Sequence, residues 1–372
     1  MYENDKRIVL SLDAGGTNFV FSAIQGYKEI VEPINMEAVS DNLEECLNAI
    51  VSGFEQIKSQ LKEKAVAISF AFPGPADYKN GIIGDLPNFK AFRKGIALGP
   101  FLQKKFNLPV YINNDGNLFA YGEALNGALP MVNDWLTKAG NNKQYNNLVG
   151  ITLGTGFGAG VVLNNVLMLG DNGCGGDVWI MKNKKYPAMI VEESVSIRAV
   201  KRVYQELSGH DASNLSPKDI FDIAEGHLEG DRQAAISSFE ELGEMAGDAV
   251  AYALTIVDGL VLVGGGLCGA AKYILPSMTK ELQKEIGLFS GEQMPSMQME
   301  IFNLMDAQAK TDFLTSEECS VKIPFSEELV HYNRSKKIGI LCSQIGTSKA
   351  VMDGAYAYAL QQIDEAGIGC CK

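Results

Sequence analysis

The hydrophobic positions in the first 130 residues predict alternating strands and helices. Apolar runs at Ile8–Leu12 and Phe19–Ile24 lie on either side of a glycine-rich turn, which is typical of a β-hairpin. Over residues 41–64 apolar residues recur three and four positions apart, the spacing of an amphipathic helix. Further strands are predicted at 65–71 and 109–113, followed by a helix at 116–126.

The same order starts again after a polar linker at 141–147. Leu148–Leu153 and Ala159–Leu163 predict two strands around a second glycine turn. Helices are expected at about 191–206 and 233–255. A strand at 259–263 and a further helix beyond 266 follow them. The pattern therefore predicts two α/β domains with a cleft between them, one of residues 1–115 and 348–372 and one of 116–347. We expect the last helix, about 348–362, to pack on the first domain, whereas 288–337 looks like an insertion.

The composition is that of a folded protein with an excess of acidic groups. The 372 residues include 46% hydrophobic and 21% charged residues, and the net charge is −13. This charge disfavours nucleic acid and anionic membranes as partners, because both need a basic surface. Neither a membrane-spanning run nor a signal peptide is evident, so we expect a cytoplasmic protein.

Seven cysteines, an odd number, are scattered mostly as single residues. This favours reduced thiols over a disulfide framework. Only Cys370 and Cys371 are adjacent, and either inert terminal thiols or a redox or metal pair could explain them. The absence of further ligands nearby favours inert thiols.

Each predicted hairpin turn carries groups that bind anionic oxygens. In the first turn, Gly15 and Gly16 can expose backbone N–H groups, while Thr17 and Asn18 add side-chain donors. Asp13 could hold magnesium, directly or through water. The second turn has the residues Gly154, Thr155, Gly156 and Gly158. One such turn alone is more often a tight hairpin, but two could grip a polyphosphate from both sides. Neither matches the P-loop or the dinucleotide fingerprint.

Two further segments have both a chemical and a structural explanation. Asp115 follows a buried strand and opens a helix, where a carboxylate could take a proton from a hydroxyl, or could merely cap the helix. Gly264, Gly265 and Gly266 follow another strand, where they could admit a flat base such as adenine or form a crowded turn.

Taken in order, these motifs resemble the ROK family of sugar kinases, within the actin-like ATPase (ribonuclease H-like, hexokinase) superfamily. The resemblance covers about 8–286 and 338–360 and is carried by Leu12–Thr17, Pro73-Gly74, Leu86–Asn88, Asn114-Asp115, Leu153–Gly156 and Val263–Gly266. It implies two α/β domains of the actin-like type, MgATP as phosphate donor, and a homodimer.

The resemblance also implies roles for single residues. Asp13–Asn18 would be the first phosphate loop, Gly154–Gly158 the second, and Gly264–Gly266 would lie by the adenosine. Asp115 matches the catalytic aspartate. The sugar ligands would be Asn88, Asn114, Asp115, Asp177 and Glu192.

The chain departs from the family pattern in one region. The usual Glu-x-Gly-His is replaced by Gly176-Asp-Val-Trp179, so Asp177 could stand for the Glu while Trp179 replaces the His. The zinc motif C-x-C-G-x-x-G-C is absent, and no zinc site is expected. Structural explanations also exist: Asp177 as a turn residue, Glu192 as a first-turn helix acid, Trp179 as a core residue, and His210, His227 and His331 as unclustered surface residues.

The sequence thus predicts an ATP-dependent kinase of a hexose or hexose derivative with Asp115 as general base. The alternative is a catalytically weak or inactive ROK-type regulator that binds sugar or nucleotide. A protein-directed ATPase of the actin or chaperone type ranks last, since the Asn88 and Asn114-Asp115 elements look sugar-directed by resemblance. Some ROK proteins are repressors with an N-terminal DNA-binding domain, and we expect none here because the first predicted strand begins by Ile8.

Overall fold

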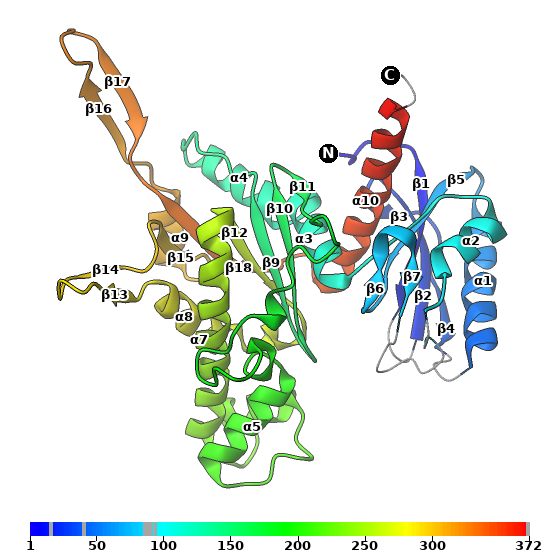
Figure 1. The fold of residues 1–372 in the computed structure, drawn as a ribbon, viewed down its shortest axis with the longest axis horizontal. Coiled ribbons are helices and arrows are strands. Elements are labelled where there is room, and N and C mark those ends of the chain that lie inside the picture. The colour runs from blue at the N-terminus through cyan, green and yellow to red at the C-terminus, as the bar shows by residue number, and fades with distance from the viewer. Residues whose placement is uncertain (15–17, 39–41, 85–91, 93–94, 370–372) are drawn as a thin grey trace. The chain divides into compact units, whose positions relative to one another are not determined.

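The computed structural model describes residues 1–14, 18–38, 42–84, 92 and 95–369. The chain divides into two compact units. Unit 1 comprises Met1–Ala128, Gly160–Gly176 and Gln344–Lys372, and unit 2 comprises Leu129–Ala159 and Asp177–Ser343. Figure 1 labels their elements. The domain boundaries expected from the sequence, 1–115 with 348–372 and 116–347, stay a prediction.

The first sheet belongs to unit 1 and has the strand order β3-β2-β1-β5-β8, with β4 beside β2. β1 runs antiparallel to β2 and parallel to β5, which is parallel to β8. The strands are β1 (Ile8–Ala14), β2 (Asn18–Gln25), β3 (Lys28–Glu29), β4 (Ile34–Glu37), β5 (Ala65–Ala71) and β8 (Val110–Asn113). The expected hairpin and the two strands after it are confirmed.

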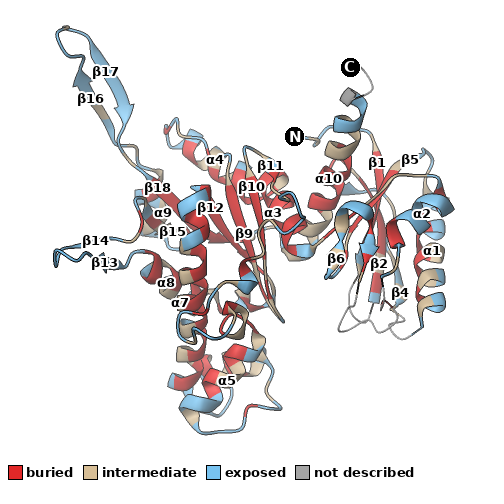
Figure 2. Ribbon diagram, viewed as in Figure 1, coloured by how far each residue is buried: buried red, intermediate tan, exposed pale blue. Residues whose placement is uncertain are grey.

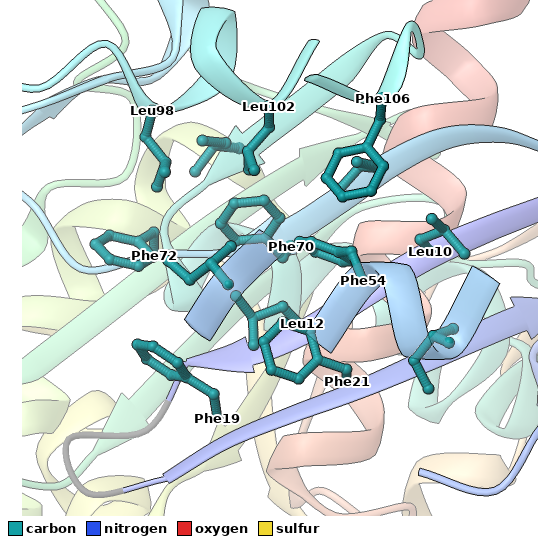
Figure 3. Packing of buried hydrophobic residues seen from close by; sticks show 14 of the residues in the cluster. Leu10, Leu12, Phe19, Phe21, Phe54, Phe70, Phe72, Leu98, Leu102 and Phe106 are labelled. Carbon is teal, nitrogen blue, oxygen red and sulfur yellow. The ribbon is translucent and has the colours of Figure 1, made fainter. Parts of the chain in front are cut away.

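Helices α1 (Leu43–Gln60) and α2 (Leu98–Phe106) cover one face of this sheet. α1 begins where the Asn42 side chain accepts hydrogen bonds from two backbone N–H groups of its first turn. Figure 3 shows the aromatic core that results, where side chains of both helices meet alternate residues of the strands. Its labelled members are Leu10, Leu12, Phe19, Phe21, Phe54, Phe70, Phe72, Leu98, Leu102 and Phe106. A small ribbon, β6 (Ala76–Asp77), η1 (Tyr78–Asn80) and β7 (Ile82–Ile83), lies between β5 and α2 in the chain.

The last helix, α10 (Thr347–Gly369), packs on β5, β1 and α3 (Asp115–Asn126), as expected from the sequence. α3 and α10 cross at very short range, because a Cβ added at Gly122 would overlap the backbone of Ala350 and one at Gly354 would overlap the backbone of Leu118. This crossing fixes the helix that carries Asp115 against the sheet.

The second sheet has the order β11-β10-β9-β12-β18-β15, and the boundary between the units falls within β10. β12 is parallel to β9 and β18, and β15 is parallel to β18. The strands are β9 (Leu148–Leu153), β10 (Phe157–Leu163), β11 (Val166–Leu167), β12 (Leu260–Gly264), β15 (Glu300–Asn303) and β18 (Lys337–Cys342).

The helices around this sheet are α4 (Ala128–Lys138), α5 (Ile197–Ser208), α6 (Pro217–Glu225), α7 (Arg232–Val257), α8 (Ala271–Leu282) and α9 (Ala307–Leu314). The 3-10 turns are η3 (Val178–Ile180), η4 (Val191–Glu193) and η5 (Gly266–Ala270). The helix expected from about 191 begins only at Ile197, because Ser196 is extended and separates it from η4. In the part of the chain described, no helix is long and apolar enough to cross a membrane.

The segment 288–337, whose interpretation as an insertion stays a prediction, contains regular structure. Its middle supplies β15 to the main sheet and then α9. On either side of these lie two hairpins, β13 (Glu285–Gly287) with β14 (Gln293–Pro295), and β16 (Glu318–Lys322) with β17 (Leu329–Asn333). Both pairs are antiparallel and form separate two-stranded sheets.

Candidate functional site

In unit 1, strand register brings the end of β1 and the segment before Asp115 to one edge of the sheet. Asp13 of β1 pairs with Ala71 of β5, and Ala71 pairs with Asn113 of β8. Neighbouring strands lie about 4.8 Å apart, so the backbones of Asp13 and Asn113 are about 10 Å apart. Both strands end at this edge, and two residues further on the chain reaches Asp115.

The cap of α3 is Asn114, so the interpretation of Asp115 as the helix cap is wrong. The Asn114 Oδ1 accepts a hydrogen bond of 2.6 Å from the Asn117 backbone N–H. Asp115 is the first residue inside the helix and is exposed, with one carboxylate oxygen 2.9 Å from the Gly116 N–H.

Buried Asn113 stabilises the turn that presents Asp115. Its Oδ1 accepts hydrogen bonds from the Asn114 N–H at 2.9 Å and from the Asn117 Nδ2 at 3.0 Å. Because the Oδ1 of Asn114 is used for capping, a sugar hydroxyl would have to meet the Nδ2 donors of Asn114. The polar residues at the strand end thus have a structural role, which leaves the Nδ2 group of Asn114 outside the capping contact.

Asp13 stands at the end of β1, where the surrounding protein raises the pKa of its carboxyl. A divalent cation would offset this effect by stabilising the charged form. A carboxylate at the end of a strand fits magnesium, which takes few protein ligands and completes its shell with water and phosphate oxygens. Asn18 begins β2 and is exposed. Gly15, Gly16, Thr17 and Asn88 lie outside the described residues.

In unit 2, Glu192 and the start of α5 hold the second glycine turn. Gly154 N–H donates to Gly156 O at 3.1 Å within the turn, and Ile197 N–H donates to Gly154 O at 2.9 Å. The Phe157 N–H, at the start of β10, donates to the Glu192 Oε2 at 3.0 Å. A Cβ added at Gly156 would lie 2.6 Å from the same oxygen, so a larger residue there would displace the Glu192 carboxylate.

Arg198 completes this support, although nothing in the sequence singled it out. Its Nη1 donates to Thr155 O at 3.2 Å, and its Nη2 donates to carboxylate oxygens of Glu192 at 3.3 Å and Glu193 at 3.1 Å. One guanidinium therefore joins the second turn to two acidic side chains. The exposed Thr155 and the intermediate Gly158 lie on the loop held in this way.

The Gly264–Gly266 segment lies beside the second turn. Gly264 pairs with Thr152 of β9, two residues before Gly154. Gly265 has a positive φ of 91°, and a Cβ there would collide with the carbonyl of Leu153. Crowding thus explains Gly265. Gly266, by contrast, is exposed with open space at its Cβ position, so the packing of the described residues does not require a glycine there.

Asp177 and Glu192 both belong to unit 2, in the neighbouring turns η3 and η4. Asp177 precedes η3, and partial burial raises the pKa of its carboxyl, opposed by a hydrogen bond from the Trp179 side chain. Trp179 is 38% exposed, so its interpretation as a core residue is wrong. Glu192 lies in the first turn of η4, which agrees with its interpretation as a first-turn helix acid. Its carboxylate also accepts the hydrogen bond from Phe157 that holds the second glycine turn.

The described part of the chain contains no group of three or more His, Cys, Asp or Glu side chains arranged to hold a metal. The three histidines are exposed, as expected. The expected absence of zinc stays a prediction.

Comparison with known proteins gives concordant results. The ROK family matches residues 9–308. The crystal structure of a glucokinase from Parabacteroides distasonis ATCC 8503 is 56% identical, covers 97% of this chain and 99% of its own, and has a TM-score of 0.87. The glucokinase of Thermotoga maritima is 24% identical over 74% of this chain and 86% of the relative. The N-acetyl-D-glucosamine kinase of Photobacterium profundum is also 24% identical, over 77% and 91%.

These likenesses confirm the α/β fold class of the actin-like sugar kinases. They agree with the order of motifs found along the sequence. The family match spans both glycine turns, Asp115, Glu192 and the Gly264–Gly266 segment. The chain therefore belongs to the ROK family.

Proposed function

We propose that this protein transfers the γ-phosphate of ATP to a hydroxyl of a hexose, with glucose as the first candidate and Asp115 as general base. That it is an ATP-dependent sugar kinase follows from its family and from its 56% identity to a glucokinase over nearly the whole chain. The acceptor sugar and the roles of single residues are the proposal.

The observation that carries the proposal is the register of three neighbouring parallel strands, β1, β5 and β8. Asp13, Ala71 and Asn113 lie side by side across them. This register brings two carboxylates to the same edge of the sheet in unit 1: Asp13, which is suited to bind a cation, and Asp115, which is suited to accept a proton. A regulator that only binds a sugar would need neither carboxylate in this arrangement.

The proton and the phosphoryl group move in one balanced step. The sugar hydroxyl gives its proton to the Asp115 carboxylate while its oxygen forms a bond to the γ-phosphorus. The bond from that phosphorus to the β–γ bridging oxygen breaks, and ADP leaves with the electron pair. Asp115 is suited to this role because it is exposed at a helix start and its carboxylate is not used as the cap.

The glycine turns would bind the phosphates of ATP through backbone N–H groups. Asp13 would hold magnesium, which supplies positive charge to the phosphate oxygens when bound. Gly264–Gly266 would lie by the adenosine, where the open space at Gly266 supports close approach of a ligand.

Asn88, Asn114, Asp177 and Glu192 are proposed to contact the sugar. For Glu192 this role coexists with its hydrogen bond to the second turn. We expect Trp179, which replaces the histidine of the family pattern, to determine which sugar the protein prefers. An exposed indole can stack on the apolar face of a sugar ring, which supports this assignment.

A cytoplasmic location, a homodimer and the absence of nucleic-acid and membrane partners belong to the same proposal. They rest on the family resemblance, the net charge of −13 and the composition.

The test is ADP release by the purified protein with MgATP across glucose, fructose, mannose and N-acetylated hexosamines. A sugar-dependent signal in the wild type that Asp115→Ala abolishes would establish the kinase and name its acceptor. Sugar and ATP binding by a folded protein, with no ADP release for any sugar, would favour the alternative of an inactive ROK-type regulator.

A further inference from the structure

The two hairpins of unit 2 are exposed on nearly all their residues. We call 285–295 the short arm and 318–333 the long arm. Figure 1 shows both projecting away from the six-stranded sheet, and Figure 2 shows them as exposed along most of their length. All five residues of β17 and four of the five in β16 are exposed. A two-stranded ribbon alone is only marginally stable in water, so packing against a partner would stabilise these arms.

Register makes the long arm amphipathic. The pairs Cys319–Tyr332 and Val321–Val330 share one face, because paired residues of antiparallel strands point the same way. The pairs Glu318–Asn333 and Ser320–His331 occupy the other face, with Lys322–Leu329. One face is therefore apolar and the other mostly polar.

The short arm repeats this arrangement. Ile286 pairs with Met294 on one face, while the neighbouring pairs are Glu285–Pro295 and Gly287–Gln293. Each arm also carries a fully exposed phenylalanine beyond its strands, Phe289 at 115% and Phe325 at 110% of the reference exposure. Both arms thus expose an apolar pair on one face and a phenylalanine beyond the strands.

The exposed apolar area is that of a stable interface. The two phenylalanines each offer about 150–250 Å². Apart from Leu329, which lies on the mostly polar face, seven more apolar side chains on the arms are 37–54% exposed and add roughly 200–400 Å² at ordinary burial areas. These are Ile286, Leu288, Met294, Val321, Ile323, Val330 and Tyr332. The total is on the order of 500–900 Å², against about 800 Å² per partner in a standard interface.

We propose that the two arms are the dimerisation surface of this protein and that the partner is a second copy of the chain. A two-fold interface places the same patch on both subunits, so the patch must be complementary to itself. Two apolar ribbon faces satisfy this condition when packed against each other. Glu318, Ser320 and His331 stay in water on the outer faces.

The proposal deepens the homodimer of the proposed function and leaves the reaction untouched. The long arm lies beyond the residues that match the family, which end at 308. None of the residues assigned to sugar or ATP belongs to either arm. A monomeric variant should therefore still release ADP in a sugar-dependent way, so failure of the dimer and failure of the kinase are distinguishable.

The experiment is sedimentation velocity of the full chain over a range of micromolar concentrations. The wild type should have twice the 40.2 kDa mass of one chain. Val321→Glu with Val330→Glu places two charges on the apolar face and should raise the dimer dissociation constant at least about a hundredfold. Ser320→Glu with His331→Glu is the matched control, because this neighbouring pair lies on the polar face and should leave the dimer intact.

Phe289→Ser with Phe325→Ser gives a second variant whose changes lie beyond the strands, and it should also weaken the dimer while leaving the far-ultraviolet circular dichroism spectrum of the folded chain unchanged. A wild type that is monomeric at every concentration would overturn the proposal. So would a dimer that survives the apolar-face pair, or one that both glutamate pairs weaken equally. A monomeric wild type whose turnover falls in the apolar-face variant would show instead that the arms cover the chain's own substrate site.

Discussion

The Glu192 carboxylate accepts a hydrogen bond from the Phe157 backbone N–H, 3.0 Å away, although 35 residues separate them in the chain. The proposed sugar ligand thus also holds the proposed phosphate loop. Since Arg198 joins the same carboxylate to Thr155, any change in this group should affect both substrates.

Gly156→Ala should damage catalysis without unfolding the protein. The new Cβ would lie 2.6 Å from the Glu192 Oε2, so the carboxylate or the loop must move. Misplacement by about 1 Å costs roughly a hundredfold in rate, and we expect kcat/KM to fall by about that factor. Steady-state kinetics would measure it. Gly269→Ala is the control, because its Cβ would meet no atom within 4 Å; equal losses in both variants would contradict the explanation.

Arg198→Gln should loosen the second turn. It removes the hydrogen bond to Thr155 O and leaves Glu192 and Glu193 without their shared cation. Because the Arg198 side chain is 53% exposed, solvent screens the ion pairs and we expect about a tenfold rise in KM for ATP. Arg202→Gln, one turn later in α5 and paired with Glu206, should change KM little. Identical KM values for the two variants would refute this role for Arg198.

Gly354→Ala should destabilise unit 1. The added Cβ would collide with the Leu118 carbonyl where α10 crosses α3, and relieving this overlap should cost about 1–3 kcal/mol of unfolding free energy. Gly367→Ala in the same helix meets no atom within 4 Å and should be neutral or stabilising by up to about 1 kcal/mol. Urea unfolding curves would compare them. A Gly354→Ala protein as stable as the wild type would show that α3 and α10 do not cross in this way.

The ion pairs of Arg7 should make stability depend on pH. The Arg7 guanidinium lies 2.7 Å from Asp5 and 2.5 Å from Asp364, and it lowers the pKa of both carboxyls below their ordinary value of 3.8. Near that pH the unfolded chain binds more protons than the folded one, so the stabilisation is present at neutral pH and is lost on acidification.

Arg7→Gln should therefore lower the melting temperature at neutral pH and converge with the wild type as the pH falls below the ordinary carboxyl pKa value of 3.8. Melting followed by circular dichroism across this range would test the prediction. A constant difference between the two proteins at all pH values would mean that the ion pairs are not its source.

The sequence could predict those parts of the fold that depend on local pattern. β5 and β9 have the predicted bounds because their apolar runs are continuous and end at glycine or proline signals. The start of α3 differed by one residue, since Asn114 rather than Asp115 makes the capping hydrogen bond. Either residue type is a good cap, so only geometry could decide.

The support of the second glycine turn could not be predicted. The contacts of Glu192 and Arg198 with Phe157 and Thr155 join segments about 35–43 residues apart, and no local pattern encodes such a pairing. The strands of the arms were also not predicted from the sequence pattern, although Cys319, Val321 and Ile323 do alternate with polar residues. The alternation is short, and nothing in the sequence says that its apolar face is left uncovered.

The central claim is that Asp115 accepts the proton of the sugar hydroxyl, and Asp115→Asn tests it most directly. The amide keeps the shape of the side chain but cannot take the proton, so kcat should fall by about 10²–10⁴-fold while ATP affinity, measured by calorimetry, stays within about twofold. Asp134→Asn, on α4 and paired only with Lys138 in the described contacts, should match the wild type in both quantities. Near-normal turnover of Asp115→Asn with the best sugar would contradict the account.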